Sequence, residues 1–262
     1  MRPFSADVRP YHWLAIYYDL FFGSLVPWMA GAREHILGGL MGKVESVCDL
    51  ACGTGTLAVD FAQKGIKTYA VDLSPDFCRL ARAKARKAGV KVRVMRADMR
   101  SFELPEQVDL VTCQFDALNH VPSKTGLAQV AKSVVRALRP GGYFWFDVNT
   151  RLAFKETWVH TWWREWPGIV IVMRNGNDSA HDRAWTDVEW FIREDRLWRR
   201  RHEHVEEVCW SGAEVRRALR DAGFGHIHTW DVGQFLRNDP FVRPGHRTFY
   251  LARKANRSVA GG

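Results

Sequence analysis

The stretch Val47-Cys48-Asp49-Leu50-Ala51-Cys52-Gly53-Thr54-Gly55-Thr56 decides the fold of this 262-residue chain. Residues 45–50 have the pattern of a short buried strand, and residues 56–64 have the pattern of a helix. Two glycines one residue apart let the backbone between them adopt turn angles that other residues avoid and come close to a ligand. The first N–H groups of the following helix can then bind an anionic group.

A second acidic residue lies at the end of the next predicted strand. Residues 66–71 lead into Asp72, 23 residues after Asp49, where a carboxylate can accept hydrogen bonds from a ribose diol. The unit therefore predicts a nucleoside site. Ala58 stands where the third glycine of the dinucleotide fingerprint would fall. Because alanine is allowed there, this position alone does not separate a nicotinamide dinucleotide from other nucleosides.

The acidic residue inside the first strand distinguishes a nicotinamide dinucleotide from other nucleosides. With it, the motif D-x-A-C-G-T-G closely resembles the first motif of the class I S-adenosylmethionine-dependent methyltransferases. Further segments resemble that family in the same order, namely residues 71–75, 96–99, 108–113 and 138–142. The resemblance covers residues 45–148 and implies S-adenosylmethionine as the cofactor. Ala51 departs from the family, which usually has glycine at this position.

The resemblance also implies which residues bind the cofactor. They are Tyr17, Tyr18, Asp49, Ala51, Cys52, Gly53, Thr54, Gly55, Asp72, Leu73, Asp98, Met99, Gln114 and Phe115. By this likeness, Asp49 and the glycine turn hold the methionine portion, Asp72 the ribose and Asp98 the adenine amine. Tyr18, or its neighbour Tyr17, would bind the methionine carboxylate or reach the acceptor. Simple hydrophobic docking of their helix is the alternative.

Strands and helices alternate through the first two-thirds of the chain. Strands are expected at residues 45–50, 66–71, 91–96, 108–114 and 142–148, and helices at 56–64, 75–88 and 124–138, the last ended by Pro140-Gly141-Gly142. Such alternation predicts an α/β fold with a Rossmann-like, doubly wound, mostly parallel sheet. Two final strands would complete seven, the last antiparallel as in the family. Ligands of such sheets bind beyond the carboxyl ends of the strands.

Five segments are expected along the chain. Residues 1–44 are rich in aromatic side chains and predict a lid of one or two helices, and residues 45–150 form the cofactor-binding core. Residues 151–210 combine clustered tryptophans with long alternating runs, which predicts a small antiparallel sheet inserted as a roof over the active site. Residues 211–254 supply a helix and strands that complete the core, and residues 255–262 form a flexible tail.

The cofactor determines the chemistry that the protein must support. A methyl group on a sulfonium is already activated, so the acceptor lone pair needs alignment at about 3 Å and, if the acceptor is protonated, a base. The candidate catalytic residues are His120, Asp116 and Tyr18. His120 comes first because an imidazole, with an ordinary pKa of about 6.5, accepts a proton at neutral pH. Alternatively, His120 caps the following helix or packs under the lid, and Asp116 organises its loop.

The segment after the fourth strand limits the class of molecule that is expected to accept the methyl group. The motif N/D-P-P-Y/F/W of amino-methylating DNA enzymes is replaced by Gln114-Phe115-Asp116-Ala117. Together with the predicted roof, this favours a nitrogen or oxygen atom of a small molecule as the methyl acceptor. The alternatives are an RNA or protein acceptor, a lipid or quinone acceptor, and a protein that binds S-adenosylmethionine without catalysis.

Composition sets further limits. The net charge of +9 comes largely from helix faces and from arginines beside acidic residues, which favours a solvated surface over a nucleic-acid site. No 18-residue apolar run and no signal-peptide core occur, so a cytoplasmic protein without a membrane span is expected. The five scattered cysteines contain no C-x-x-C pair, so neither a zinc site nor a disulfide framework is expected, and no metal is predicted. Either a monomer or a homodimer fits this composition.

Overall fold

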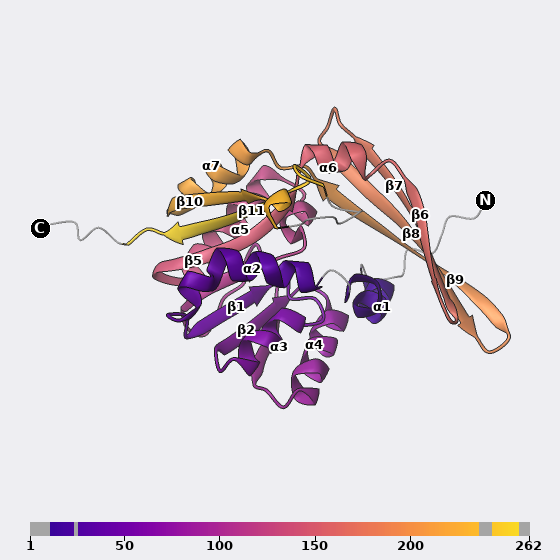
Figure 1. The fold of residues 1–262 in the computed structure, drawn as a ribbon, viewed down its shortest axis with the longest axis horizontal. Coiled ribbons are helices and arrows are strands. Elements are labelled where there is room, and N and C mark those ends of the chain that lie inside the picture. The colour runs from indigo at the N-terminus through magenta and orange to yellow at the C-terminus, as the bar shows by residue number, and fades with distance from the viewer. Residues whose placement is uncertain (1–10, 24–25, 236–242, 257–262) are drawn as a thin grey trace, which may run out of the picture.

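In the computed structural model, which describes residues 11–23, 26–235 and 243–256, the chain builds two β-sheets within the described ranges. The larger has seven strands in the order β10-β11-β5-β4-β1-β2-β3, and the smaller has four in the order β6-β7-β8-β9. Figure 1 shows helices on both faces of the larger sheet and the smaller sheet as a separate layer, with α1 between them. The predicted Rossmann-like α/β fold with an added antiparallel sheet is confirmed.

Five parallel strands form most of the larger sheet. They are β1 (Ser46–Leu50), β2 (Lys67–Asp72), β3 (Val92–Arg96), β4 (Val108–Cys113) and β5 (Leu138–Asn149). The chain returns through β10 (Phe224–Asp231) and β11 (Arg247–Lys254), and β11 lies antiparallel between β5 and β10. Every residue of β1 is buried, because this strand lies at the centre of the sheet with helices on both sides.

Five of the described helices cover the larger sheet, namely α3 (Thr56–Gln63), α4 (Pro75–Lys87), α5 (Lys124–Ala137) and α7 (Gly212–Ala222), with α2 (Val26–Met41) preceding β1. Serine side chains cap the starts of three of them, α4, α5 and α7. Ser74 accepts a hydrogen bond from Phe77 N at the start of α4, and Ser123 accepts one from Gly126 N at the start of α5. Ser211 forms a capping box with Glu214. None of the described helices is long and apolar enough to cross a membrane.

Two details differ from the sequence prediction. The strand β5 begins at Leu138, so Pro140-Gly141-Gly142 lies inside it rather than in a turn. Leu138 pairs with Val108, and the register then shifts before Leu110, which accommodates Gly141 at a φ of 77°. The tryptophan-rich segment forms α6 (Arg151–Glu156) and the strand β6 (Thr161–Trp166), neither of which was predicted.

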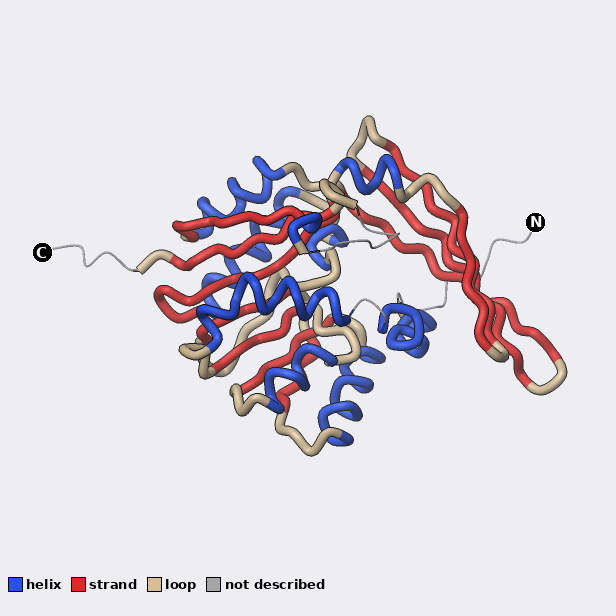
Figure 2. Tube along the Cα trace, viewed as in Figure 1, coloured by secondary structure: helices blue, strands red, loops and turns tan. Residues whose placement is uncertain are grey.

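The smaller sheet is a four-stranded antiparallel meander. Besides β6 it contains β7 (Ile169–Asp178), β8 (Arg183–Glu194) and β9 (Leu197–Val208). Figure 2 shows it as a long twisted ribbon whose far hairpin extends beyond the rest of the molecule. Its buried residues Ile171, Val188 and Trp190 pack with Leu14 of α1 (His12–Phe22). Residues 1–10 of the predicted lid and 257–262 of the predicted tail lie outside the described residues.

The helix α1 is held at its start by the smaller sheet. Glu203 of β9 accepts hydrogen bonds from Trp13 N and Leu14 N, both at 2.9 Å, and from Trp190 Nε1 at 3.0 Å. The residue preceding α1, Tyr11, supplies no side-chain cap of its own. A carboxylate from a distant strand therefore satisfies the free N–H groups at the start of this helix, a position where negative charge is favourable.

The other side of α1 is held by the core. Asp19 accepts hydrogen bonds from Thr54 Oγ1 at 2.5 Å and from Lys84 Nζ at 2.6 Å, and Lys84 also donates to Thr54. At the start of the helix, His12 Nδ1 lies 2.7 Å from Asp76 Oδ2. Because Thr54 belongs to the glycine turn, these contacts attach α1 directly above that turn.

We expect Gly55→Ala to destabilise the fold more than the matched variant Gly65→Ala. Both glycines have a φ of 79°, so both variants carry the left-handed penalty of about 1–2 kcal/mol. A Cβ at residue 55 would lie 2.8 Å from Ala81 Cβ, whereas no described atom lies within 4 Å of a Cβ at residue 65. Urea denaturation should show a further loss of about 1–3 kcal/mol for Gly55→Ala. Equal losses would contradict this account.

Candidate functional site

In the turn after β1, every second residue from Ala51 to Gly55 has a left-handed backbone conformation. The φ angles are 55° at Ala51, 54° at Gly53 and 79° at Gly55. The alanine that departs from the family pattern therefore adopts a conformation that glycine takes at lower cost. Cys52 N donates to Val71 O at 3.0 Å, which holds the turn against the end of β2. The turn presents its backbone at the carboxyl edge of the sheet.

Asp72 closes the turn from the end of β2. Its Oδ2 accepts from Gly53 N and its Oδ1 from Ser74 N, both at 2.9 Å. Burial raises the pKa of Asp72 to about 6, and these two backbone hydrogen bonds lower it only in part. The carboxylate is thus fixed beside the glycine turn, where the sequence predicts the ribose.

Two buried polar atoms near this edge lack a hydrogen-bond partner among the described residues. Asp49 Oδ1 accepts from Thr112 Oγ1 at 2.9 Å, but its Oδ2 has no partner, and neither does Gln114 Nε2. Burial raises the pKa of Asp49 to about 7. Unsatisfied buried groups are expected where a polar ligand completes the hydrogen bonding. These residues therefore fit a bound nucleoside cofactor such as S-adenosylmethionine.

The predicted adenine contacts lie beside the turn after β3. Asp98 accepts from Arg100 N at 2.8 Å and pairs with the Arg100 guanidinium, whose hydrogen bonds hold the pKa of Asp98 below its usual value. Met99 is half-buried and packs against the main core, whereas the side chain of Leu73 is 61% exposed. An exposed leucine next to Asp72 is available to contact a flat apolar group.

The two neighbouring tyrosines of α1 contact different parts of the molecule. A Cβ at Gly53 would lie 3.9 Å from Tyr18 Cε1, and the Tyr18 ring is 5.3 Å from that of Phe77, so Tyr18 covers the glycine turn. The Tyr17 ring instead lies 5.4 Å from Trp190 in the smaller sheet. This arrangement favours Tyr18 over Tyr17 as the residue that contacts the cofactor, and Tyr17 as a packing residue.

The loop after β4 contains two consecutive residues in the left-handed region. Phe115 has a φ of 56° and Asp116 a φ of 52°. The buried Asp147 of β5 holds this pair, because its two carboxylate oxygens accept from Phe115 N and Asp116 N, each at 2.9 Å. Non-glycine residues in this region cost about 1–3 kcal/mol each and persist where the surroundings fix them, often at functional sites.

Arg247 of β11 completes this arrangement. Its Nη2 lies 2.7 Å from Asp116 Oδ1, and its Nη1 pairs with Asp147. The guanidinium, with a side chain 12% exposed, thus joins the last strand of the sheet to β5 and to the loop after β4. Neither Arg247 nor Asp147 was predicted from the sequence, because no local motif marks ion pairs between residues 100 and 131 positions apart.

The same loop brings His120 to the smaller sheet. His120 Nδ1 lies 3.0 Å from Glu206 O, and its ring is 5.8 Å from the Tyr11 ring. The helix that follows is capped by Ser123, so His120 does not cap it. Three side-chain atoms lie within 4.8 Å of one another, namely one carboxylate oxygen each from Asp116 and Glu207 and one imidazole nitrogen from His120. Two predicted catalytic residues are therefore brought together with a glutamate from β9 that the sequence analysis missed.

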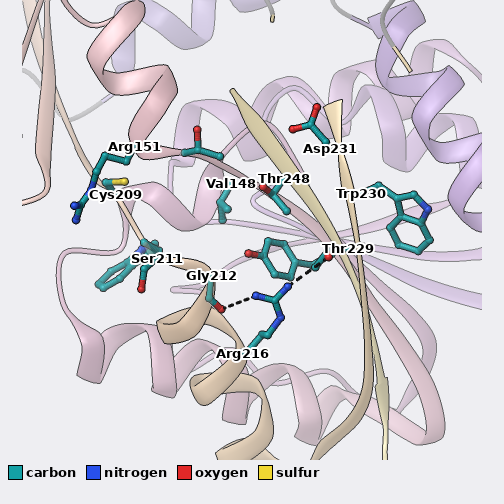
Figure 3. Close-up of a pocket in the computed structure, with 13 residues that line it drawn as sticks. Val148, Arg151, Cys209, Ser211, Gly212, Arg216, Thr229, Trp230, Asp231 and Thr248 are labelled. Atoms are coloured by element: carbon teal, nitrogen blue, oxygen red, sulfur yellow. Dashed lines mark hydrogen bonds between the residues drawn. The ribbon is translucent and has the colours of Figure 1, made fainter. Parts of the chain in front are cut away.

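A separate cavity of about 470 Å³ opens on the opposite face of β5 and β11. Val148 and Thr248 line it, whereas their neighbours Asp147 and Arg247 point to the other face, because successive strand residues alternate. Figure 3 shows Arg216 in this cavity, donating to Gly212 O and Thr229 Oγ1. None of the predicted site residues lines this cavity, so it lies apart from the candidate site.

Comparisons with known proteins agree with this geometry. Residues 47–142 match the family model described as a methyltransferase domain. The chain is 26% identical over 216 residues to the Bacillus subtilis (strain 168) protein named "Putative methyltransferase YqeM", covering 82% of this chain and 86% of that protein.

Two solved structures share the fold. A Clostridium acetobutylicum ATCC 824 S-adenosylmethionine-dependent methyltransferase has a TM-score of 0.77 at 24% identity, with 94% of this chain and 99% of that chain covered. The sugar N-methyltransferase KedS8 from Streptoalloteichus sp ATCC 53650 has a TM-score of 0.76 at 20% identity, with 98% of each chain covered.

We expect the affinity for S-adenosylmethionine to fall as the pH decreases through about 6. Ribose hydroxyls donate to an ionised carboxylate, so binding lowers the pKa of Asp72 from about 6 and must expel a proton below that pH. Calorimetric titrations between pH 5 and 8 should show a plateau at high pH and a loss approaching about tenfold per unit at low pH. Asp72→Asn should bind weakly with a flatter profile. A pH-independent dissociation constant in the wild type would contradict this expectation.

We expect Arg247→Gln to destabilise the protein by about 3–5 kcal/mol, because it leaves the buried carboxylates of Asp116 and Asp147 without their guanidinium. Urea denaturation followed by tryptophan fluorescence measures this loss. The control is Arg253→Gln on the same strand, where the arginine is exposed and its Nε donates to Gly141 O. Similar losses in the two variants would show that the buried ion pair is not needed.

Proposed function

We propose that this S-adenosylmethionine-dependent methyltransferase binds its cationic methyl donor at the carboxyl edge of the seven-stranded sheet and methylates the nitrogen of a small-molecule amine. Asp49, Gly53, Gly55 and Asp72 would hold the cofactor. When bound, the cofactor supplies a methyl group on a sulfonium cation, and its transfer leaves a neutral thioether. The remaining task of the protein is to bind, orient and deprotonate the acceptor.

The carboxylates around the Tyr11 side chain carry this proposal. Burial is the main reason that the pKa of Tyr11 is raised, and the charges of Glu207, Asp116, Asp72 and Glu203 raise it further. These groups come from β9, the loop after β4 and the end of β2, so four carboxyl groups lie around the space between the glycine turn and the smaller sheet. Such a space attracts cations and disfavours anionic acceptors.

The position of this space under a helix favours a small acceptor. It lies under α1, between the core and β9, because Glu203 and Asp19 attach the helix to both sides. The description of KedS8 as a sugar N-methyltransferase also supports an amine acceptor for a chain of the same fold. His120 and Asp116, which border this space, are the residues proposed to contact the acceptor.

A binding protein without catalytic activity needs no acceptor site. The strained pair Phe115–Asp116, held by Asp147 and Arg247, is costly to maintain without such a role. This favours an enzyme over a sensor that merely binds the cofactor.

We expect the protein to transfer a labelled methyl group to primary amines at least about a hundredfold faster, as kcat/KM, than to the alcohols of the same skeleton. The measurement uses methyl-¹³C S-adenosylmethionine with amino sugars and their hydroxyl counterparts, together with a low-molecular-weight cell extract. Mass spectrometry finds the products, and ¹³C–¹H correlation spectra separate N-methyl from O-methyl groups. Labelled oxygen, or no product from a protein that binds the cofactor, would overturn the proposed function.

A further inference from the structure

Glu207 is a buried carboxylate that borders the proposed acceptor space. It lies near the end of β9 and is 6% exposed, and Asn149 Nδ2 donates to its Oε2 at 3.3 Å. Burial and the charge of Asp116 raise its pKa well above the usual value, while Asn149 and Arg247 act in the opposite direction. A buried carboxylate beside a second carboxylate is stabilised by a cation or a proton.

Three hydrogen-bond acceptors converge at this point. The ligand atoms of Asp116, His120 and Glu207 lie within 4.8 Å of one another. Because His120 Nδ1 faces the carbonyl oxygen of Glu206, Nδ1 is the donor and Nε2 carries the lone pair of the neutral ring. A primary ammonium has three N–H donors, and hydrogen bonds of about 2.8 Å place its acceptors about 4.6 Å apart. The three groups therefore equal the N–H donors of an ammonium in number, and their separation of at most 4.8 Å is compatible with hydrogen bonds to one such group.

The charges nearby favour an ammonium over a divalent metal ion. Asp116 Oδ1 already accepts from Arg247 Nη2 at 2.7 Å, so a doubly charged ion bound to Asp116 would lie next to a guanidinium. Asp116, Asp147 and Glu207, when ionised, carry three negative charges against the one positive charge of Arg247.

We propose that Asp116, His120 and Glu207 form the binding site for the ammonium group of the acceptor, and that Glu207 takes the proton this group must lose before methylation. This inference rests on the proposed amine methylation. One N–H bond of the ammonium breaks, its electron pair stays on nitrogen as the lone pair, and the proton bonds to a Glu207 carboxylate oxygen. Asp116, held by Arg247, and His120 accept the two remaining N–H groups and so hold the nitrogen in place.

Sinefungin tests the ammonium site without a known acceptor. In this cofactor analogue a carbon replaces the sulfonium sulfur, and an amine on that carbon replaces the methyl group, whereas S-adenosylhomocysteine has neither charge nor amine there. Calorimetry should show that Glu207→Gln reduces the preference for sinefungin over S-adenosylhomocysteine by about threefold to tenfold. Glu165→Gln, which removes an exposed carboxylate from β6, should leave the preference unchanged. An unchanged preference in Glu207→Gln would overturn the ammonium site.

The affinity for S-adenosylhomocysteine serves as the control for correct folding of the variant. Glu207→Gln should leave this affinity unchanged, because glutamine keeps a hydrogen-bond acceptor for Asn149. With an amine substrate, Glu207→Gln should lower kcat at least about tenfold and remove the acidic limb of the pH profile of kcat. A retained limb would show that Glu207 does not take the proton. The groups facing Glu207 are Tyr11 of α1, Asp116 and His120 after β4, Asp147 and Asn149 of β5, and Arg247 of β11.

Two further outcomes separate the possible failures. Stoichiometric binding of Mg²⁺ or Mn²⁺ to the wild type, lost in Glu207→Gln, would identify the three groups as a metal site and overturn this inference alone. Methylation of an alcohol that is unaffected by Glu207→Gln would overturn the proposed amine function as well.

Discussion

The pairing of Arg247 with Asp116 and Asp147 is the constraint on which the conformation of the loop after β4 depends. It joins the last strand of the sheet, the end of β5 and the loop after β4, three segments that are far apart in the sequence. The two carboxylates stabilise a buried guanidinium, and Asp147 in turn accepts hydrogen bonds from the backbone of Phe115 and Asp116. Because removing one partner of a buried pair is costly, the left-handed conformation of this loop is fixed before any ligand binds.

The helix α1 links the two halves of the molecule in a similar way. At its start, Glu203 from the smaller sheet accepts from two backbone N–H groups, and near its end Asp19 binds Thr54 and Lys84 of the core. Aromatic rings add contacts on both sides, with Tyr17 against Trp190 and Tyr18 against Phe77. The glycine turn and β9 are therefore held at a fixed separation, which brings Glu207 close to Asp116 and His120.

The glycine turn and the strands around it could be predicted because their signals are local. The glycine spacing, the acidic residue within the first strand and Asp72 at the end of the second each reflect a requirement of one strand–turn–helix unit. Gly55 illustrates this, since its left-handed angle and its approach to Ala81 both arise within two neighbouring units. The strand β6 was missed for the opposite reason: its residues are largely exposed, and pairing with β7 rather than an alternating pattern makes it a strand.

The sequence by itself determined the alternation of strands and helices in the parallel part of the larger sheet, the glycine turn, and the acidic residues expected to hold the cofactor. Hydrophobic periodicity, caps and turn residues act over a few neighbouring positions, so they can be read from a single chain. Tertiary structure decided that Glu207 joins Asp116 and His120, that Tyr18 rather than Tyr17 covers the turn, and that Arg247 fixes the loop after β4. These contacts depend on how two sheets and a helix pack, and the residues involved carry no mark of their partners in the local sequence.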